Sequence, residues 1–265
     1  MQIPDGYVAY DRDGIVGVVR ADLAELPPAA FFADGDALPA ARGRGEGVRV
    51  LRLGDGPVAV ARTYRRGGAL RGVLCDQFLD SQRPCREVAA LNALRVAGVD
   101  AVEPLAGLAR RDGALFQLRL LTALVEGALP LPAFVASRPE MRRAAVARAG
   151  AVVAAAFAAG LRHRDLHPDN LVASAGETGP VVHLLDLDRA TLRAPVPIPV
   201  RLAMLTRMAR YLVRHRASLP TTVARTDGLR FLRGLRLDRE HRQAYARAIS
   251  ARLRRQLTLR RWFGR

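Results

Sequence analysis

The chain contains no lysine, although it is strongly basic. Its 42 basic residues are all arginine, against 25 acidic residues, so the formal net charge is +17. Apart from any protonated histidine, every cationic side chain of this protein is therefore a guanidinium. A chain this basic attracts anions such as phosphates, nucleic acid or an anionic bilayer face. Alanine and glycine are also abundant, so part of the arginine excess fits a GC-rich coding bias.

Cysteine and aromatic residues are also scarce. The two cysteines, Cys75 and Cys85, are too few for a disulfide framework or a zinc site, and we interpret them as ordinary cytosolic thiols. Aromatic residues make up 5% of the chain, which leaves few rings to stack against bases. Nucleic acid is therefore not expected as a partner, and the oligomeric state is left open.

No stretch is apolar enough for us to expect a membrane span. The longest apolar run, residues 144–161, is mostly alanine and is interrupted by Arg148 and Gly150. Residues 1–14 include acidic side chains and lack the apolar core of a secretory signal. No internal repeat of solenoid length is present. These absences predict a soluble or peripheral protein rather than an integral one.

Residues 161–188 carry polar side chains at the spacing of a kinase catalytic loop followed by a metal-holding aspartate. Phosphoryl transfer needs a carboxylate to orient the attacking hydroxyl and accept its proton, a role that Asp165 can fill. It also needs oxygen ligands for magnesium, which Asn170 and Asp186 can supply. His163 would brace the loop. The alternative, a polar turn between two strands, accounts for Asn170 but not for the other three residues together.

Upstream of this loop, residues 48–62 are typical of a β-hairpin around a Gly-Asp-Gly turn. Three glycines precede its first strand and are expected to fold over nucleotide phosphates through their backbone N–H groups: Gly43, Gly45 and Gly47. A flexible linker in front of the hairpin is the alternative interpretation of these glycines.

The returning strand of the hairpin carries Arg62 where protein kinases usually have a lysine that contacts the phosphates and pairs with a helix glutamate. Arginine can bind phosphate through its fork, so the role is retained in principle. The apolar spacing of about residues 85–97 predicts an amphipathic helix with Val96 on its apolar side. Glu87, in the first turn, is the expected partner of Arg62. Alternatively, Glu87 only complements the helix dipole.

These patterns predict an α+β, protein-kinase-like fold with two lobes. We expect a small β-rich N-lobe over residues 1–124, which binds the nucleotide, and a mainly helical C-lobe over residues 125–265. Glycine and proline mark residues 122–135 as the hinge. A long helix over residues 141–159 leads into the catalytic loop. After Asp188 the chain has no extended activation segment or anchor of the kind that regulated protein kinases carry.

The C-terminal part of the chain reads as two amphipathic basic helices, over residues 202–216 and 238–259. Trp262 and Phe263 follow them, beside clustered arginines. This combination suits contact with an anionic lipid surface. The alternative is a solvated basic helix end with a tryptophan that anchors it to the core.

Four segments together resemble the lipopolysaccharide kinases, and among them the 3-deoxy-D-manno-octulosonic acid (Kdo) kinases: TYRRGGAL at 63–70, REVAALNALRVAGV at 86–99, HRDLHPDN at 163–170 and LLDLDRA at 184–190. YRRGG is the most specific of these. The resemblance implies a kinase-like two-lobed fold, ATP and Mg²⁺, and phosphorylation of a Kdo hydroxyl on lipid A precursor. It also implies a peripheral position on the cytoplasmic face of the inner membrane. Asp165 matches the catalytic aspartate of the family and Asp186 its metal aspartate.

The substrate implied by this resemblance is an anionic, lipid-linked sugar, because Kdo carries a carboxylate and lipid A carries phosphates. Tyr64, Arg65, Arg66 and Arg71 lie in or just after the TYRRGG segment, and we expect them to contact this substrate. A solvated strand end is the alternative for Arg65 and Arg66.

Other functions stay open at this point. Small-molecule phosphotransferases of the aminoglycoside or choline type share the loop aspartate, but they usually line the acceptor site with acids, and the basic charge here disfavours them. A serine/threonine kinase is disfavoured because the activation segment is missing. A pseudokinase-like, membrane-associated binding module would account for the missing lysine, but not for Asp165, Asn170 and Asp186 together.

Overall fold

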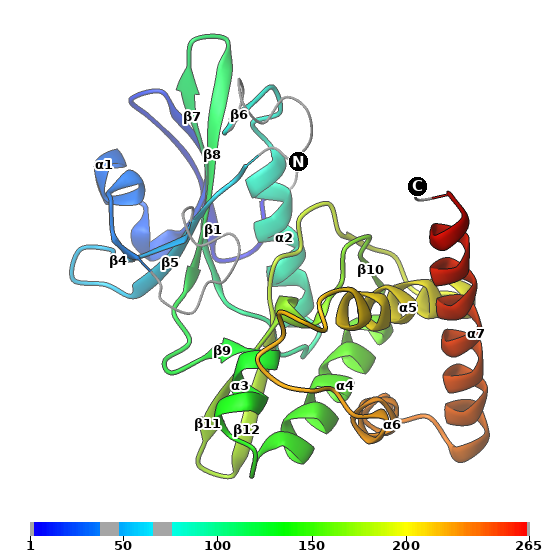
Figure 1. The fold of residues 1–265 in the computed structure, drawn as a ribbon. Coiled ribbons are helices and arrows are strands. Elements are labelled where there is room, and N and C mark those ends of the chain that lie inside the picture. Colours follow the sequence, from blue (N-terminus) through cyan, green and yellow to red (C-terminus); the bar gives the residue numbers. More distant parts are fainter. Residues whose placement is uncertain (1–2, 38–47, 66–75, 264–265) are drawn as a thin grey trace. The chain divides into compact units, whose positions relative to one another are not determined.

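The computed structural model describes residues 3–37, 48–65 and 76–263, with side chains described as far as residue 256. Within these limits the chain forms two compact units (Figure 1). The first unit takes in residues 1–97, 101–125 and 186–189, and the second takes in residues 98–100, 126–185 and 190–265. The short segment around Asp186 therefore belongs to the first unit, although the sequence placed it in the C-lobe.

Several residues with an expected role lie outside the described residues. Among them are the candidates for phosphate binding and two of those for the acceptor: Gly43, Gly45, Gly47, Arg66 and Arg71. The side chains of Trp262 and Phe263 lie outside as well. Their expected roles stay predictions.

The first unit is built on an antiparallel sheet with the strand order β1-β2-β7-β8-β5-β4-β3, and β6 pairs with β8. The hairpin expected around residues 54–56 is present, and it pairs Leu51 of β4 with Ala59 of β5. Leu51, Ala59 and Ala61 are buried in one apolar cluster with Phe31. The strands are Tyr7–Arg12 (β1), Ile15–Arg20 (β2), Asp36–Ala37 (β3), Val48–Arg52 (β4), Val58–Thr63 (β5), Gln77–Phe78 (β6), Pro104–Asp112 (β7) and Leu115–Ala123 (β8).

Helices α1 (Pro28–Phe32) and α2 (Arg83–Val96) lie on opposite sides of this sheet (Figure 1), and a 3-10 turn at Ala21–Leu23 precedes α1. The buried stripe of α2 includes Glu87, Leu91 and Leu94. The prediction that Val96 lies on this stripe is wrong, because Val96 is 82% exposed. It follows Leu94 by two residues, which is about 200° around the helix.

Helix α2 approaches strand β7 closely at Gly107. A Cβ atom on Gly107 would lie 2.7 Å from the backbone carbonyl oxygen of Pro84 and 2.8 Å from Cγ2 of Val88. The thiol of Cys85 donates a hydrogen bond to the carbonyl oxygen of Gly107 at 3.4 Å. Only glycine fits at position 107 of β7, and this allows the first two turns of α2 to lie directly on the sheet. Glu87 is carried by these two turns.

The second unit contains helices and small sheets. Helix α4 confirms the helix predicted at 141–159, and α5 and α7 confirm the two basic helices. The expected hinge at 122–135 is partly helical, because Pro130 and Pro132 begin α3 rather than break the chain. The elements are β9 (Leu129–Pro130), α3 (Leu131–Ser137), α4 (Arg142–Ala158), β10 (Leu161–Arg162), β11 (Leu171–Gly176), β12 (Gly179–Leu184), β13 (Thr191–Leu192), α5 (Ile198–Arg214), α6 (Arg225–Gly234) and α7 (Arg239–Phe263).

Helices α4 and α6 meet in backbone contact. A Cβ atom on Gly150 of α4 would lie 2.1 Å from the carbonyl oxygen of Phe231, and its neighbour across the contact is Gly234. Asp227, which is 4% exposed, joins the same two helices by accepting a hydrogen bond from Arg142 at 2.5 Å. The sequence did not predict α6, because the helix is short and contains two weak helix formers, both glycines. None of the described helices has the length and apolarity needed to span a membrane.

Candidate active site

Arg62 lies on strand β5, opposite Val48 of β4 and Leu120 of β8. Its Nη2 donates hydrogen bonds to both carboxylate oxygens of Glu87, at 2.8 Å and 2.7 Å. Its Nη1 lies 3.4 Å from Oδ1 of Asp186. The pairing with Glu87 that the sequence predicted is therefore present, and the guanidinium contacts a second carboxylate as well.

Glu87 is the centre of this cluster and is 2% exposed. Besides the two bonds from Arg62, its carboxylate accepts a hydrogen bond from the hydroxyl of Tyr64 and one at 2.9 Å from the backbone N–H of Leu187. Burial raises the pKa of Glu87, and the positive charge of Arg62 opposes that rise. These four hydrogen bonds, from three donor groups, allow a charged carboxylate to be buried here.

Arg62 stays positively charged in this environment. Burial alone would lower the pKa of its guanidinium, but the carboxylates of Glu87 and Asp186 raise the pKa above its ordinary value. The guanidinium also lies 4.5 Å from the centre of the Tyr64 ring, a cation–π contact. Arg62 is thus a cation held beside Glu87, and its expected equivalence to the kinase lysine stays a prediction.

Tyr64 has a different environment from the one expected. It is 2% exposed, and its hydroxyl is bonded to Glu87. Burial raises the pKa of Tyr64 well above its ordinary value, and the negative charge of Glu87 adds to the rise. The side chain expected to contact the acceptor sugar therefore supports the Arg62–Glu87 pair. Of the neighbouring arginines, Arg65 is described and is exposed.

The segment Asp186–Arg189 has an unusual backbone. Asp186 and Arg189 both have a φ close to +60°, which side chains other than glycine seldom adopt. Between them, the carboxylate of Asp188 binds the guanidinium of Arg83, with Nε donating to Oδ1 at 2.6 Å and Nη2 donating to Oδ2. Burial tends to raise the pKa of Asp188, but the bonds from Arg83 lower it below its ordinary value.

Sequence reasoning missed Arg83. The helix expected from about residue 85 leaves Arg83 outside, whereas α2 begins at Arg83, where a positive charge opposes the helix dipole. Arg83 also lies 5.0 Å from the ring centre of Tyr64 and 5.1 Å from that of Phe78. It therefore joins the cluster built around Glu87.

The predicted catalytic loop lies in the second unit, between β10 and β11. His163 is 4% exposed, and its Nδ1 accepts a hydrogen bond from the backbone N–H of Asp165 at 2.9 Å. The side chain of Asp165 is exposed. His163 thus fixes the backbone of the loop from inside, as expected, and leaves the carboxylate of Asp165 facing solvent within its unit.

Asn170 ends this loop in a 3-10 turn, Pro168–Asn170. Its Oδ1 accepts a hydrogen bond from the backbone N–H of His167 at 3.0 Å, and its carbonyl oxygen accepts one from Leu185 at 2.9 Å. The residue is 2% exposed. These bonds hold the loop against the strand region that leads to Asp186.

Tyr211 of α5 supports the same loop and was not singled out from the sequence. Its hydroxyl donates to the carboxylate of Asp169, and its ring stacks on that of His167 with the centres 4.7 Å apart and the planes 10° apart. The pattern of residues 202–216 predicts an amphipathic helix but does not indicate this contact. The arrangement depends on the tertiary fold.

Asp186 and Asn170, the two residues predicted to hold magnesium, each carry an oxygen atom of a kind that magnesium binds. In the described part of the chain, no three His, Cys, Asp or Glu side chains come together as a site for an ion. Magnesium does not need such a cage, because it is usually held by one or two protein oxygen ligands together with substrate phosphates and water. A carboxylate at Asp186 in the first unit and an amide oxygen at Asn170 in the second are ligands of that kind.

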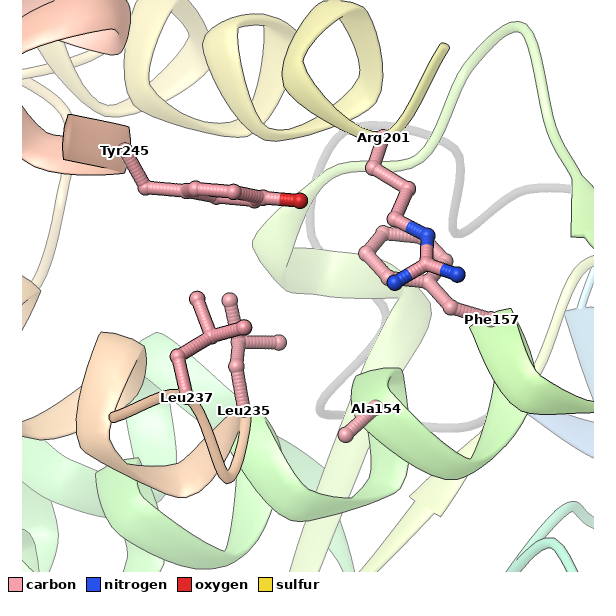
Figure 2. A pocket seen from close by; sticks show the side chains of 6 residues that line it. All are labelled: Ala154, Phe157, Arg201, Leu235, Leu237 and Tyr245. Atoms are coloured by element: carbon pink, nitrogen blue, oxygen red, sulfur yellow. The ribbon is translucent and has the colours of Figure 1, made fainter. Parts of the chain in front are cut away.

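A cavity of about 40 Å³ lies among the helices of the second unit (Figure 2). The hydroxyl of Tyr245 points into it, and the guanidinium of Arg201 lies 5.9 Å from the ring centre of Phe157. None of the residues expected to act in phosphoryl transfer lines it. The lining residues are Ala154, Phe157, Arg201, Leu235, Leu237 and Tyr245.

Comparison with known proteins identifies the family. The model of the "Lipopolysaccharide kinase (Kdo/WaaP) family" matches residues 36–234. A 3-deoxy-D-manno-octulosonic acid kinase of Vibrio vulnificus (strain YJ016) is 26% identical over 194 residues, which is 71% of this chain and 78% of the relative. The same kinase of Xanthomonas campestris pv. campestris (strain B100) is 33% identical over 143 residues, which is 52% of this chain and 55% of that one.

A solved structure, "WaaP in complex with acyl carrier protein", has the same fold. It aligns with a TM-score of 0.58 and 20% sequence identity, over 94% of this chain and 97% of that one. The expectation of a protein-kinase-like α+β fold is thereby confirmed. Together with the match over residues 36–234, the comparisons show that this chain belongs to the lipopolysaccharide kinase (Kdo/WaaP) family, and so is a phosphotransferase whose acceptor is a sugar hydroxyl.

Proposed function

We propose that this enzyme transfers the γ-phosphoryl group of ATP to a hydroxyl of Kdo, or of another inner-core sugar, on a lipid A precursor. The observation that carries this proposal is the contact of Arg62 with both Glu87 and Asp186. In a chain without lysine, it supplies the cation and the ion pair that kinases use beside the nucleotide phosphates. It also argues against a pseudokinase-like binding module, because the missing lysine has a replacement.

In this proposal Arg62 binds the α- and β-phosphates, and Glu87 holds its guanidinium in place. Asp186 and Asn170 hold magnesium through oxygen atoms. Magnesium bound with ATP bridges the phosphates and neutralises the charge that develops during transfer. The glycines at 43, 45 and 47 remain our candidates for covering the phosphates with backbone N–H groups.

Asp165 orients the sugar hydroxyl and accepts its proton as the phosphoryl group is transferred. Two features of the loop support this role. The carboxylate of Asp165 is exposed, and the bond from its backbone N–H to Nδ1 of His163 fixes the direction of the loop. His163 therefore acts by positioning. Arg65, together with Arg66 and Arg71, is our candidate for contact with the anionic sugar.

Phosphate transfer to Kdo-lipid A tests this function directly. Incubation with ATP and magnesium should give a product heavier by one phosphate in the mass spectrum. Asp165→Asn should abolish that product without lowering the thermal midpoint, because the side chain is exposed. Asp55→Asn, at an exposed hairpin turn, is the matched control. Phosphorylation of aminoglycosides or choline, with none of Kdo-lipid A, would show that the acceptor is a cationic small molecule instead.

The charge of the chain is unevenly distributed, which supports a peripheral position on an anionic membrane. Residues 190–265 contain 19 arginines and three acidic residues, so they carry +16 of the net charge of +17. In the helices of this part, Arg247, Arg254 and Arg255 are exposed. We propose that this part of the second unit docks on the anionic headgroups of the inner membrane.

Vesicle flotation tests this position. Binding to vesicles with 30% phosphatidylglycerol, and not to pure phosphatidylcholine, is expected, with loss at about 0.5 M salt. Arg254→Gln with Arg255→Gln should weaken binding about 30-fold, at about 1 kcal/mol for each arginine at the surface. Arg52→Gln with Arg143→Gln, an equal change in charge at exposed sites, is the control. Binding to acyl carrier protein and to no vesicle would favour a soluble acidic partner instead.

A further inference from the structure

The segment Asp186–Arg189 is held to the first unit at three successive residues. Asp186 lies 3.4 Å from Nη1 of Arg62, and the N–H of Leu187 donates to Glu87 at 2.9 Å. In the third contact, the side chain of Arg83 donates two hydrogen bonds, one to each carboxylate oxygen of Asp188. Such a forked pair fixes orientation as well as distance.

This fixation matters because the segment has a backbone that is costly to maintain. Asp186 has a φ of 57° and Arg189 has a φ of 58°, so a left-handed residue stands at each end. Residues in this region persist only where the surroundings impose them. Asp188, between the two, is the residue through which the surroundings can do so.

The position of Arg83 is explained by this contact and not by the helix that carries it. Arg83 is the first residue of α2, where a positive charge faces the positive end of the helix dipole. Its side chain is 16% exposed and that of Asp188 is 22% exposed, so water screens the pair only in part. The guanidinium also packs on the rings of Tyr64 and Phe78.

We infer that Arg83 is a positioning residue, and that its fork on Asp188 sets the geometry of the magnesium ligand Asp186. The inference rests on the proposed function, in which Asp186 holds magnesium. It separates the two aspartates of the Asp-Leu-Asp sequence. Both oxygens of Asp188 are bonded to Arg83, so Asp188 is a structural anchor, whereas Asp186 is the ligand.

Tyr64 connects this anchor to the nucleotide side of the cluster. Its ring contacts both guanidiniums, with the ring centre 4.5 Å from that of Arg62 and 5.0 Å from that of Arg83. Its hydroxyl is bonded to Glu87. A change at Arg83 is therefore transmitted to Asp186 along the chain from Asp188, while Tyr64 limits how far either guanidinium can move.

Calorimetric titration with ATP, in magnesium and separately in EDTA, tests this role in the full chain. Loss of a residue that orients a metal ligand typically weakens metal binding about 10- to 100-fold. We expect Arg83→Met and Asp188→Asn each to weaken ATP binding by that factor in magnesium and to leave binding in EDTA unchanged. The double variant should lose no more than either single one, because both remove the same contact. Arg83→Lys should fall in between, since lysine keeps the charge but not the fork.

Arg86→Met is the matched control, because Arg86 lies one turn along α2 and pairs with the exposed Asp80. Binding by Arg83→Met within about twofold of this control would overturn the inference, as would an equal loss in magnesium and in EDTA. If Arg83→Met does not fold, Arg83→Lys decides by the same two titrations. A wild-type chain that binds ATP equally with and without magnesium would refute the proposed function itself. If the wild-type chain binds ATP more tightly in magnesium than in EDTA, and every variant keeps this difference in full, only the role of Arg83 is refuted.

Discussion

Arg62→Met removes the cation that balances the most deeply buried carboxylate of the first unit's ion cluster. The side chain of Glu87 is 1% exposed and that of Arg62 is 25% exposed. Removal of one partner of a buried ion pair typically costs about 3–5 kcal/mol. The hydroxyl of Tyr64 and the N–H of Leu187 would still donate to Glu87. We therefore expect the lower end of that range, about 3 kcal/mol of unfolding free energy at pH 7.

The loss should depend on pH in a defined direction. Burial raises the pKa of Glu87, and Arg62 opposes the rise, so the pKa should rise further in the variant. A carboxyl group with a raised folded pKa stabilises the protein fully below its ordinary pKa, and this stabilisation is lost as pH rises through the folded pKa. Between those two values the unfolding free energy falls by about 1.4 kcal/mol for each pH unit. Arg62→Met should therefore be closest to wild type near pH 5 and furthest from it near pH 8.

Urea denaturation followed by circular dichroism at pH 5, 6, 7 and 8 measures this dependence. Arg62→Met with Glu87→Gln is the decisive control, because glutamine cannot titrate and the extra pH dependence should vanish. Arg86→Met, which breaks an exposed ion pair with Asp80, should cost less than about 1 kcal/mol at every pH. If Arg62→Met were destabilised equally at pH 5 and pH 8, Glu87 would not be the buried charge that Arg62 neutralises, and the argument would fail.

Three further outcomes follow from packing and burial. Gly150→Ala should lower the unfolding free energy by about 2 kcal/mol or more in urea denaturation, because the added Cβ would lie 2.1 Å from a carbonyl oxygen of α6. Gly228→Ala is the control and should be neutral or stabilising, because no atom lies within 4 Å of its added Cβ. Burial raises the pKa of the Cys85 thiol to about 11, so peptide mass spectrometry should find it unalkylated by iodoacetamide at pH 8 until the protein is unfolded. Asp227→Asn removes the charge that binds Arg142 and should lower the melting temperature by several degrees in calorimetry, since the aspartate is 4% exposed.

The sequence indicates contacts between residues that lie close together along the chain, whereas the catalytic and metal-binding roles of these residues stay predictions. His163, Asp165 and Asn170 lie within eight residues of one another, and their local hydrogen bonds follow from that closeness. The pair of Arg62 and Glu87 is predictable because kinases carry a strand cation that pairs with a helix glutamate, and the structure confirms this pair. Gly43 and its neighbours fall outside the described residues, so that expectation stays a prediction.

Other contacts could not be read from spacing. Arg83 and Asp188 are 105 positions apart, and nothing local to Asp188 indicates which of 42 arginines it meets. Tyr64 is expected at the acceptor because it lies in the TYRRGG segment, but its side chain is 2% exposed and its hydroxyl is bonded to Glu87. Helix α3 was missed because proline breaks a helix in its interior but is well suited to its first turn.

The absence of lysine determines what kind of cluster can form around Glu87. A lysine ammonium is one compact charge on a flexible stem, whereas a guanidinium is planar and presents several donors in fixed directions. Arg62 uses this property to bond both oxygens of Glu87 and to lie 3.4 Å from Asp186. Arg83 uses it to bond both oxygens of Asp188.

Both guanidiniums also lie against the ring of Tyr64, so each is held by carboxylate and by π contact at once. An ammonium would have one nitrogen in place of the two with which Arg83 binds the two oxygens of Asp188, and in place of the two with which Arg62 reaches Glu87 and Asp186. Arginine is therefore more than the by-product of a coding bias at these two positions. Elsewhere in the chain, as at exposed Arg254 and Arg255, only the charge is used, and lysine would serve the proposed membrane contact equally well.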